Sequence, residues 1–197
     1  GTSGPFGSYP SLYKKLSYDG ERMFFLCPDG VLRSYEPVKG ALADVANFSK
    51  ATAQLMDFAV APKGASAGFA AKSKFFALLR DGTILGAPEQ GGAPAEVLKL
   101  PPTESKDSWY TTICFAPADG SLVVGTYYPE CRLYRFTADG AKVQAGGWPM
   151  SGVFTSQLSN FGNEAWTIQS ASAFQLFEGH TASVNLDWVI YPTGLAK

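Results

Sequence analysis

Short apolar runs alternate with glycine-containing turns along the whole chain, and one order of runs and turns occurs four times. In each segment an apolar run leads into a turn, an aromatic or β-branched run follows, and a second turn leads into another run. The glycines of the first turns are 44, 56 and 42 residues apart, at Gly20, Gly64, Gly120 and Gly162. Short runs between turn residues are typical of β-strands, so the pattern predicts a repeat of four strand-rich units.

The pattern also places the strands within each unit. The strands after the first turns are predicted at residues 22–27, 74–79, 121–127 and 164–169. Asp-Gly between apolar runs is the strongest short hairpin signal, and two of the four following reversals have it, at Asp29-Gly30 and Asp81-Gly82. The next strands are predicted at residues 31–35, 83–85, 132–136 and 173–177. A further strand per unit is predicted near residues 43–48, 95–100, 141–144 and 183–190.

A four-stranded unit that recurs every 42 to 56 residues is typical of a β-propeller blade. We therefore predict an all-β fold of the β-propeller type, with about four four-stranded antiparallel blades that form a closed ring or part of a larger propeller. A short helix within residues 41–58 is the one competing local interpretation, because apolar side chains there have roughly helical spacing. Residues 1–8 are predicted to be a disordered leader or a cloning remnant, and residues 9–197 a single domain with blades near 9–50, 51–104, 105–150 and 151–194.

Composition narrows the classes of partner. The 16 Lys and Arg residues against 17 Asp and Glu give a net charge of −1, which excludes a strongly basic nucleic-acid-binding protein. The chain contains 14 Phe, 9 Tyr and 4 Trp, enough to build a core. No apolar run approaches the roughly 18 residues of a membrane helix, so we expect a soluble protein that does not bind nucleic acid or membranes.

The cysteines and the one histidine do not form a metal motif. Cys27, Cys114 and Cys131 are widely spaced, and His180 is the only histidine, so we expect no metal ion and no cofactor. The cysteines are interpreted as small buried side chains in strands, and one disulfide with one free thiol stays open. The compartment is undetermined, with an extracellular one slightly favoured.

Several motifs resemble known propeller families. The turns Phe58–Gly64 and Phe115–Gly120 resemble the turns between the first and second strands of many propeller blades. The segment Phe177-Glu-Gly179-His180-Thr181, followed by Val184, Trp188 and Pro192-Thr-Gly194, resembles the opening of a WD40 repeat. The elements Pro101-Pro102, Asp107-Ser108-Trp109 and Gly146-Gly147-Trp148 resemble those of tachylectin-2-like lectin propellers. These resemblances imply a propeller fold, and the last one implies glycan binding.

Three groups of residues have side chains of the kinds that enzymes use in catalysis. Gly64-Ala-Ser66-Ala-Gly68 matches the nucleophile elbow of serine hydrolases, but the surrounding pattern runs from strand to strand and only His180 is available as a base. His180 is interpreted as a structural hydrogen-bonding residue. Acidic residues at the tips of equivalent hairpins are interpreted as turn formers and not as a cation site, at Asp29, Asp81 and Glu130. We therefore predict no catalytic residue.

Aromatic residues near the loops are the better candidates for a ligand site. Tyr127 and Tyr128 are adjacent at a hairpin end, where alternation keeps at least one out of the core. Trp109 and Trp148 lie in or beside the connections between units. Aromatic faces suit both sugar stacking and protein contacts, so these four residues form the predicted ligand-binding site.

The predicted function is a non-catalytic binding module that presents loop tips and crevices between blades to a glycan or a protein. One alternative is a hydrolase, such as a glycosidase, lactonase or esterase, with its site at the central mouth of the propeller. Another is a structural piece of a larger propeller assembly. If the ring of blades is open, its end faces need partners, and a homo-oligomer is then expected.

Overall fold

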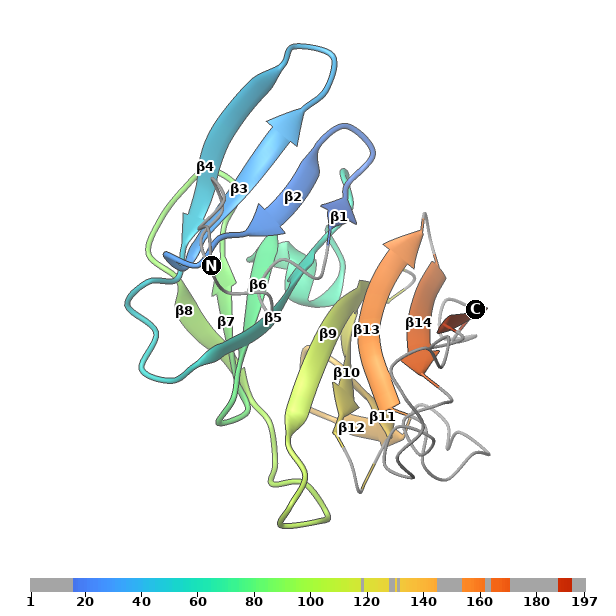
Figure 1. Ribbon diagram of the computed structural model, residues 1–197. Coiled ribbons are helices and arrows are strands. Elements are labelled where there is room, and N and C mark those ends of the chain that lie inside the picture. Colours follow the sequence, from blue (N-terminus) through green and yellow to red (C-terminus); the bar gives the residue numbers. More distant parts are fainter. Residues whose placement is uncertain are drawn as a thin grey trace, which may run out of the picture.

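A computed structural model describes residues 16–117, 119–127, 130, 132–144, 154–161, 164–170 and 188–192, with only the backbone described from residue 154 onwards. The regular secondary structure of the described residues is nearly all antiparallel β-sheet (Figure 1). One short 3₁₀ helix, η1 (Gly68–Ala71), interrupts the strands. None of the helical structure described in these ranges is long and apolar enough to cross a membrane.

The strands form four sheets in chain order. Sheet 1 contains β1 (Ser17–Tyr18), β2 (Met23–Leu26), β3 (Val31–Glu36) and β4 (Ala41–Asn47). Sheet 2 contains β5 (Leu55–Val60), β6 (Phe75–Leu79), β7 (Thr83–Ala87) and β8 (Ala95–Lys99). Sheet 3 contains β9 (Tyr110–Ala116), β10 (Ser121–Thr126), β11 (Leu133–Phe136) and β12 (Lys142–Gln144). Sheet 4 contains β13 (Phe154–Phe161), β14 (Glu164–Ser170) and β15 (Trp188–Pro192).

The all-β prediction is confirmed, and two local predictions need comment. Residues 41–47 form a strand and not a helix. They pair with β3 in a hairpin whose turn ends at Gly40. In sheet 4, β15 pairs directly with β14, in the position predicted for the strand at 173–177. The sequence predicts the strand near residues 183–190 as a further strand, after the one at 173–177. This order is wrong, because the apolar run Trp188–Pro192 is the third strand of the sheet, next to β14. Residues 173–177 lie outside the described residues.

The core lies between sheets that pack face to face. Strand β6 is buried throughout, and because successive residues point to opposite faces, it supplies both neighbouring cores. Phe75 packs against Phe24 of sheet 1 with ring centroids 5.7 Å apart, and Phe76 stacks on Phe115 of sheet 3 at 5.9 Å. Sheet 2 is therefore held between sheets 1 and 3.

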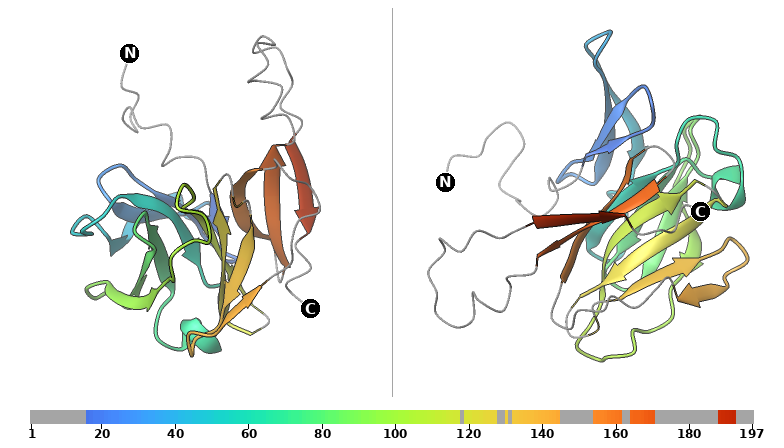
Figure 2. Two further views of the ribbon diagram at one scale, coloured as in Figure 1. Left: turned by 90° about the horizontal axis from the view of Figure 1, so that it is seen from below. Right: turned by 90° about the vertical axis from the view of Figure 1, so that its right-hand side faces the viewer.

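The first strands of the sheets lie next to one another. Strand β5 contacts β9, β9 contacts β13, and β1 contacts both β5 and β13. The carboxylate of Asp57 on β5 accepts hydrogen bonds from the Thr112 hydroxyl at 2.7 Å and the Ile113 amide at 2.8 Å, both on β9. The other strands of each sheet follow outwards in chain order, as the two further views show (Figure 2). This is the arrangement of propeller blades around an axis.

Two cysteines are part of the buried interior. Cys27 and Cys114 are both buried, so for these two the interpretation as small core side chains is confirmed. Cys131 lies outside the described residues.

Candidate functional site

Two of the predicted ligand-binding residues, Trp109 and Tyr127, stack on each other where sheet 3 begins. Trp109 directly precedes β9 and Tyr127 directly follows β10, and the Tyr127 amide donates a hydrogen bond to the Trp109 carbonyl at 2.8 Å. Neighbours on adjacent strands place their side chains on one face. Their ring centroids are 4.6 Å apart with an interplanar angle of 25°.

Arg80 extends this pair across to the neighbouring sheet. It directly follows β6 of sheet 2, and its guanidinium carbon lies 4.5 Å from the centroid of the Trp109 ring, a cation–π geometry. Arg80 is exposed, Trp109 is half-buried and Tyr127 is 39% exposed. We call these three residues the Arg80–Trp109–Tyr127 stack. Sequence reasoning missed Arg80, whose only signal is its position just before the Asp81-Gly82 turn.

Arg80 also differs in its charge partners. Arg22, Arg33, Arg132 and Arg135 each form an ion pair with a carboxylate. Within the part of the chain that the structure describes, no carboxylate lies within ion-pair distance of Arg80. Its guanidinium is thus oriented by an aromatic ring and not by an internal salt bridge.

The connection from β8 to β9 carries Trp109. Hydrogen bonds and an ion pair join it to the β10–β11 hairpin, which carries Tyr127. This connection is the lowest loop in Figure 1. The Glu104 carboxylate pairs with Arg132 at 2.6 Å, and the Glu104 amide donates to Glu130 at 3.0 Å. The Tyr134 hydroxyl donates to Glu130 and, at 3.2 Å, to Glu104. The two segments therefore hold each other in place around the stack.

Two tyrosines at this network, Tyr110 and Tyr134, stay protonated. Burial, together with the charges of Glu130 and Glu104, raises the pKa of Tyr110 to about 12. Burial and the hydrogen bond to Glu130 also raise the pKa of Tyr134. Because a neutral phenol is a hydrogen-bond donor, Tyr134 keeps joining the two carboxylates throughout the physiological pH range. The Tyr110 hydroxyl donates to the Pro101 carbonyl at 3.0 Å.

The remaining predicted site residues lie outside the described residues. This applies to Tyr128 and Trp148, and also to His180.

The Gly64–Gly68 motif has a packing explanation. Ser66 is exposed in a loop, several residues after the end of β5, and η1 begins only at Gly68. Gly68 and Gly120 meet at the contact between this loop and the turn from β9 to β10, where the Phe69 amide donates to the Gly120 carbonyl at 2.9 Å. A Cβ on Gly120 would lie 2.0 Å from the Ala67 carbonyl oxygen. A Cβ on Gly68, the glycine at the end of the motif, would lie 2.4 Å from the Gly120 carbonyl oxygen, so both glycines permit close packing of this loop against the turn.

The three acidic hairpin residues each have a partner within their own sheet. Asp29 pairs with Arg33 at 2.7 Å, and Asp81 pairs with Lys99 at 2.9 Å. Glu130 accepts the Tyr134 hydroxyl. No group of three or more His, Cys, Asp or Glu side chains placed to hold a metal ion occurs among the residues that the structure describes.

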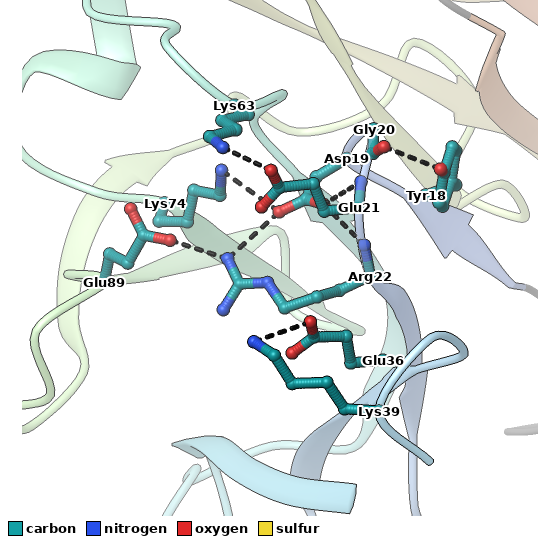
Figure 3. Close-up of polar contacts among 10 residues, drawn as sticks. All are labelled: Tyr18, Asp19, Gly20, Glu21, Arg22, Glu36, Lys39, Lys63, Lys74 and Glu89. Atoms are coloured by element: carbon teal, nitrogen blue, oxygen red, sulfur yellow. Dashed lines mark hydrogen bonds and ion pairs between the residues drawn. The ribbon is translucent and has the colours of Figure 1, made fainter. Parts of the chain in front are cut away.

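A second polar cluster lies at the opposite end of β6 and joins sheets 1 and 2 (Figure 3). Its centre is the buried carboxylate of Asp19, which accepts the Arg22 amide at 3.0 Å and the Arg22 guanidinium at 3.0 Å. The buried ammonium of Lys74, just before β6, lies 3.4 Å away. Arg22 also pairs with Glu89 of the β7–β8 connection at 2.6 Å, and Lys63 pairs with Glu21. Its charges are matched within the cluster, which makes it a structural link between the sheets.

Comparisons with known proteins support the fold. No protein-family model and no curated protein sequence matches the chain. A Bacteroides thetaiotaomicron protein of unknown function superposes with a TM-score of 0.55 at 9% identity, over 79% of this chain and 41% of its own. The WD40 repeats of RRP9 superpose with a TM-score of 0.52 at 11% identity, over 84% of this chain and 46% of theirs. A chain of the nidogen–laminin complex superposes with a TM-score of 0.52 at 8% identity, over 79% of this chain and 74% of its own.

These similarities confirm the β-propeller-like fold. The chain spans less than half the length of the first and second of these structures.

Proposed function

We propose that this protein is a non-catalytic binding module whose Arg80–Trp109–Tyr127 stack contacts a protein ligand. The observation that carries the proposal is the convergence of an arginine, a tryptophan and a tyrosine from two sheets at one end of the propeller. These are the three residue types most enriched at interface hot spots. The tryptophan and the tyrosine offer broad contact area with little loss of side-chain entropy.

The geometry also suits rapid, specific association. The connection carrying Trp109 is held by Glu104, Glu130 and Arg132, so less ordering remains to be done on binding. Arg80 offers a guanidinium that needs no internal salt bridge to be broken first. A carboxylate on the partner is the group that this guanidinium binds best.

Glycan binding is a second candidate. It is favoured by the stacked Trp109–Tyr127 pair at the loop ends, because sugars stack on aromatic faces. A glycan array probed with the wild-type chain and with Trp109→Ala and Trp148→Ala tests this candidate. Sugar binding that both substitutions leave unchanged, or no binding by the wild type, removes its support.

The hydrolase alternative gains no support from the residues that the structure describes. Ser66 lies in an exposed loop, and the Glu104 and Glu130 carboxylates already bind Arg132 and Tyr134.

A displayed library of random peptides tests the protein-binding proposal. Peptides selected on the wild-type chain are titrated against Arg80→Gln and Trp109→Ala, with Lys39→Gln as control because Lys39 is exposed in the turn between β3 and β4. We expect each stack substitution to weaken binding at least about tenfold, roughly 1.4 kcal/mol, and the control to leave it unchanged. Unchanged thermal unfolding shows that the variants are folded. Peptides that bind wild type and both stack variants equally contradict the proposal.

A further inference from the structure

A cavity of about 430 Å³ lies between sheets 1 and 2, beside the ends of β4, β6 and β8. Residues 50–52 of the connection from β4 to β5 line one side of it. Strands β7 and β8 of sheet 2 line the other side, with Leu85, Glu96 and Lys99. Pockets that bind small molecules have volumes of roughly 300–1,000 Å³. The cavity is therefore large enough for one small organic molecule.

The cavity has an apolar floor and a charged rim. Leu79 is 1% exposed and Leu85 is partly buried, and these two side chains form the floor. Lys50 and Glu96 are exposed at the rim, one from each side. Its lining contains no aromatic residue, so it offers a sugar no ring on which to stack. This combination fits a molecule that has an apolar part and charged groups.

The rim offers charges that are not used within the chain. Among the residues that the structure describes, no ion-pair partner lies within reach of the Lys50 ammonium or the Glu96 carboxylate. Lys99 donates to the Asp81 carboxylate at 2.9 Å and to the Thr83 hydroxyl at 2.7 Å. An ammonium has three N–H donors, so Lys99 keeps one for a ligand. The rim thus has an acceptor for a cation and two donors for an anion.

We propose that this cavity binds a small zwitterion that carries an ammonium, a carboxylate and an apolar group. The ammonium pairs with Glu96, and the carboxylate accepts hydrogen bonds from Lys50 and Lys99. The apolar group lies against Leu79 and Leu85. Free amino acids and short peptides share this chemistry.

The cavity and the Arg80–Trp109–Tyr127 stack lie on opposite sides of sheet 2. Leu79 and Asp81 line the cavity on the side of sheet 1. The guanidinium of Arg80, between them in the sequence, lies over Trp109 on the side of sheet 3. The cavity shares no lining residue with the stack, so this proposal is independent of the proposed function.

Titrations followed by nuclear magnetic resonance test the ligand chemistry. The probes are leucine, leucyl-leucine, N-acetylleucine, which lacks the ammonium, and leucinamide, which lacks the carboxylate. We expect leucine or leucyl-leucine to bind the wild-type chain with a Kd of about 1 mM or below, and the other two to bind at least about tenfold more weakly. The tighter zwitterion shows whether the cavity takes free amino acids or short peptides. No binding of either zwitterion, or equal binding of all four probes, overturns the proposal.

Substitutions at the rim test the two charge contacts. Glu96→Gln should weaken zwitterion binding at least about tenfold and remove the preference for leucine over N-acetylleucine, because the ammonium loses its partner. Lys50→Gln should weaken zwitterion binding and reduce the preference for leucine over leucinamide. Glu36→Gln and Lys39→Gln, at an ion pair outside the cavity, are the matched controls and should bind as wild type. Folded Glu96 and Lys50 variants that bind the zwitterion as tightly as wild type overturn the proposal.

Side-chain signals in the same titrations locate the site. We expect the methyl signals of Leu79 and Leu85 to shift with the zwitterion and the indole signal of Trp109 to stay unmoved. A zwitterion that shifts the Trp109 signal and leaves both leucines unmoved binds at the stack instead, which overturns the proposal.

Discussion

Each of the chain's Asp-Gly pairs forms the same local structure. In every one, the Asp side chain accepts a hydrogen bond from the amide two residues further on, and the glycine has a positive φ. The aspartates are Asp19, Asp29, Asp81, Asp119 and Asp139. This chemistry is entirely local, so it can be predicted from sequence. It also accounts for the acidic hairpin tips at Asp29 and Asp81 without any bound cation.

At the same scale, substitution of Gly120 tests the contact between the β9–β10 turn and the loop before η1. Gly120→Ala combines a φ of +71° with a Cβ 2.0 Å from a backbone oxygen, so we expect a loss of about 3 kcal/mol in the free energy of unfolding. Gly64→Ala is the control, because its φ is +80° but no atom lies within 4 Å of the added Cβ, and we expect a loss of about 1 kcal/mol. Denaturant unfolding measures both, and equal losses contradict the packing role.

Asp19 makes the stability of the protein dependent on pH. Burial disfavours the charged carboxylate, but hydrogen bonds from the Arg22 and Glu21 amides and the Arg22 guanidinium, with the charge of Lys74, outweigh it and lower the pKa. A lowered pKa in the folded state stabilises the protein above the unfolded pKa of about 3.9, and this stabilisation is lost as the pH falls through the folded value.

Asp19→Asn is therefore expected to lower the free energy of unfolding by about 3 kcal/mol at neutral pH, since Lys74 and Arg22 lose a buried partner. The variant should also lose less further stability than wild type when the pH falls below about 4. Asp29→Asn, at an exposed ion pair, should cost under about 1 kcal/mol. Parallel stability curves for wild type and Asp19→Asn from pH 6 to about 2.5 contradict the assigned titration.

At the scale of elements, most strands could be predicted because alternation and turn residues are properties of short segments. The segments 74–79 and 121–127 were predicted from such signals and became β6 and β10. The position of Arg80 over Trp109 was not predictable, because it depends on how sheet 2 packs against sheet 3. The place of β15 beside β14 likewise depends on pairing between distant segments.

The connection from β8 to β9 provides a test at this scale. Glu130→Gln weakens the acceptor for the Glu104 amide and the Tyr134 hydroxyl, so amide hydrogen exchange in residues 101–109 should become at least about threefold faster while exchange in β6 stays unchanged. Asp139→Asn, in the β11–β12 turn, should leave both segments unchanged. Unaltered exchange in residues 101–109 of the Glu130 variant contradicts the fastening role.

At the scale of the whole molecule, the sheets place two chemically different surfaces at separate positions. One end of sheets 2 and 3 carries the Arg80–Trp109–Tyr127 stack, with aromatic and cationic character. The outer face of sheet 1 carries the exposed apolar side chains of Tyr18, Tyr35 and Leu42. The low charge of the chain, 17% of residues, fits strands that are packed between neighbouring sheets.

The indole N–H signal of Trp109 tests the central claim most directly. The chain has 4 Trp residues, so the side-chain signals can be resolved by nuclear magnetic resonance and Trp109 assigned from its Trp109→Phe variant. When a peptide selected on the wild-type chain is added, we predict that the Trp109 signal shifts progressively and saturates with the binding curve. A peptide that saturates the protein and leaves the Trp109 signal unmoved would show that the ligand binds elsewhere.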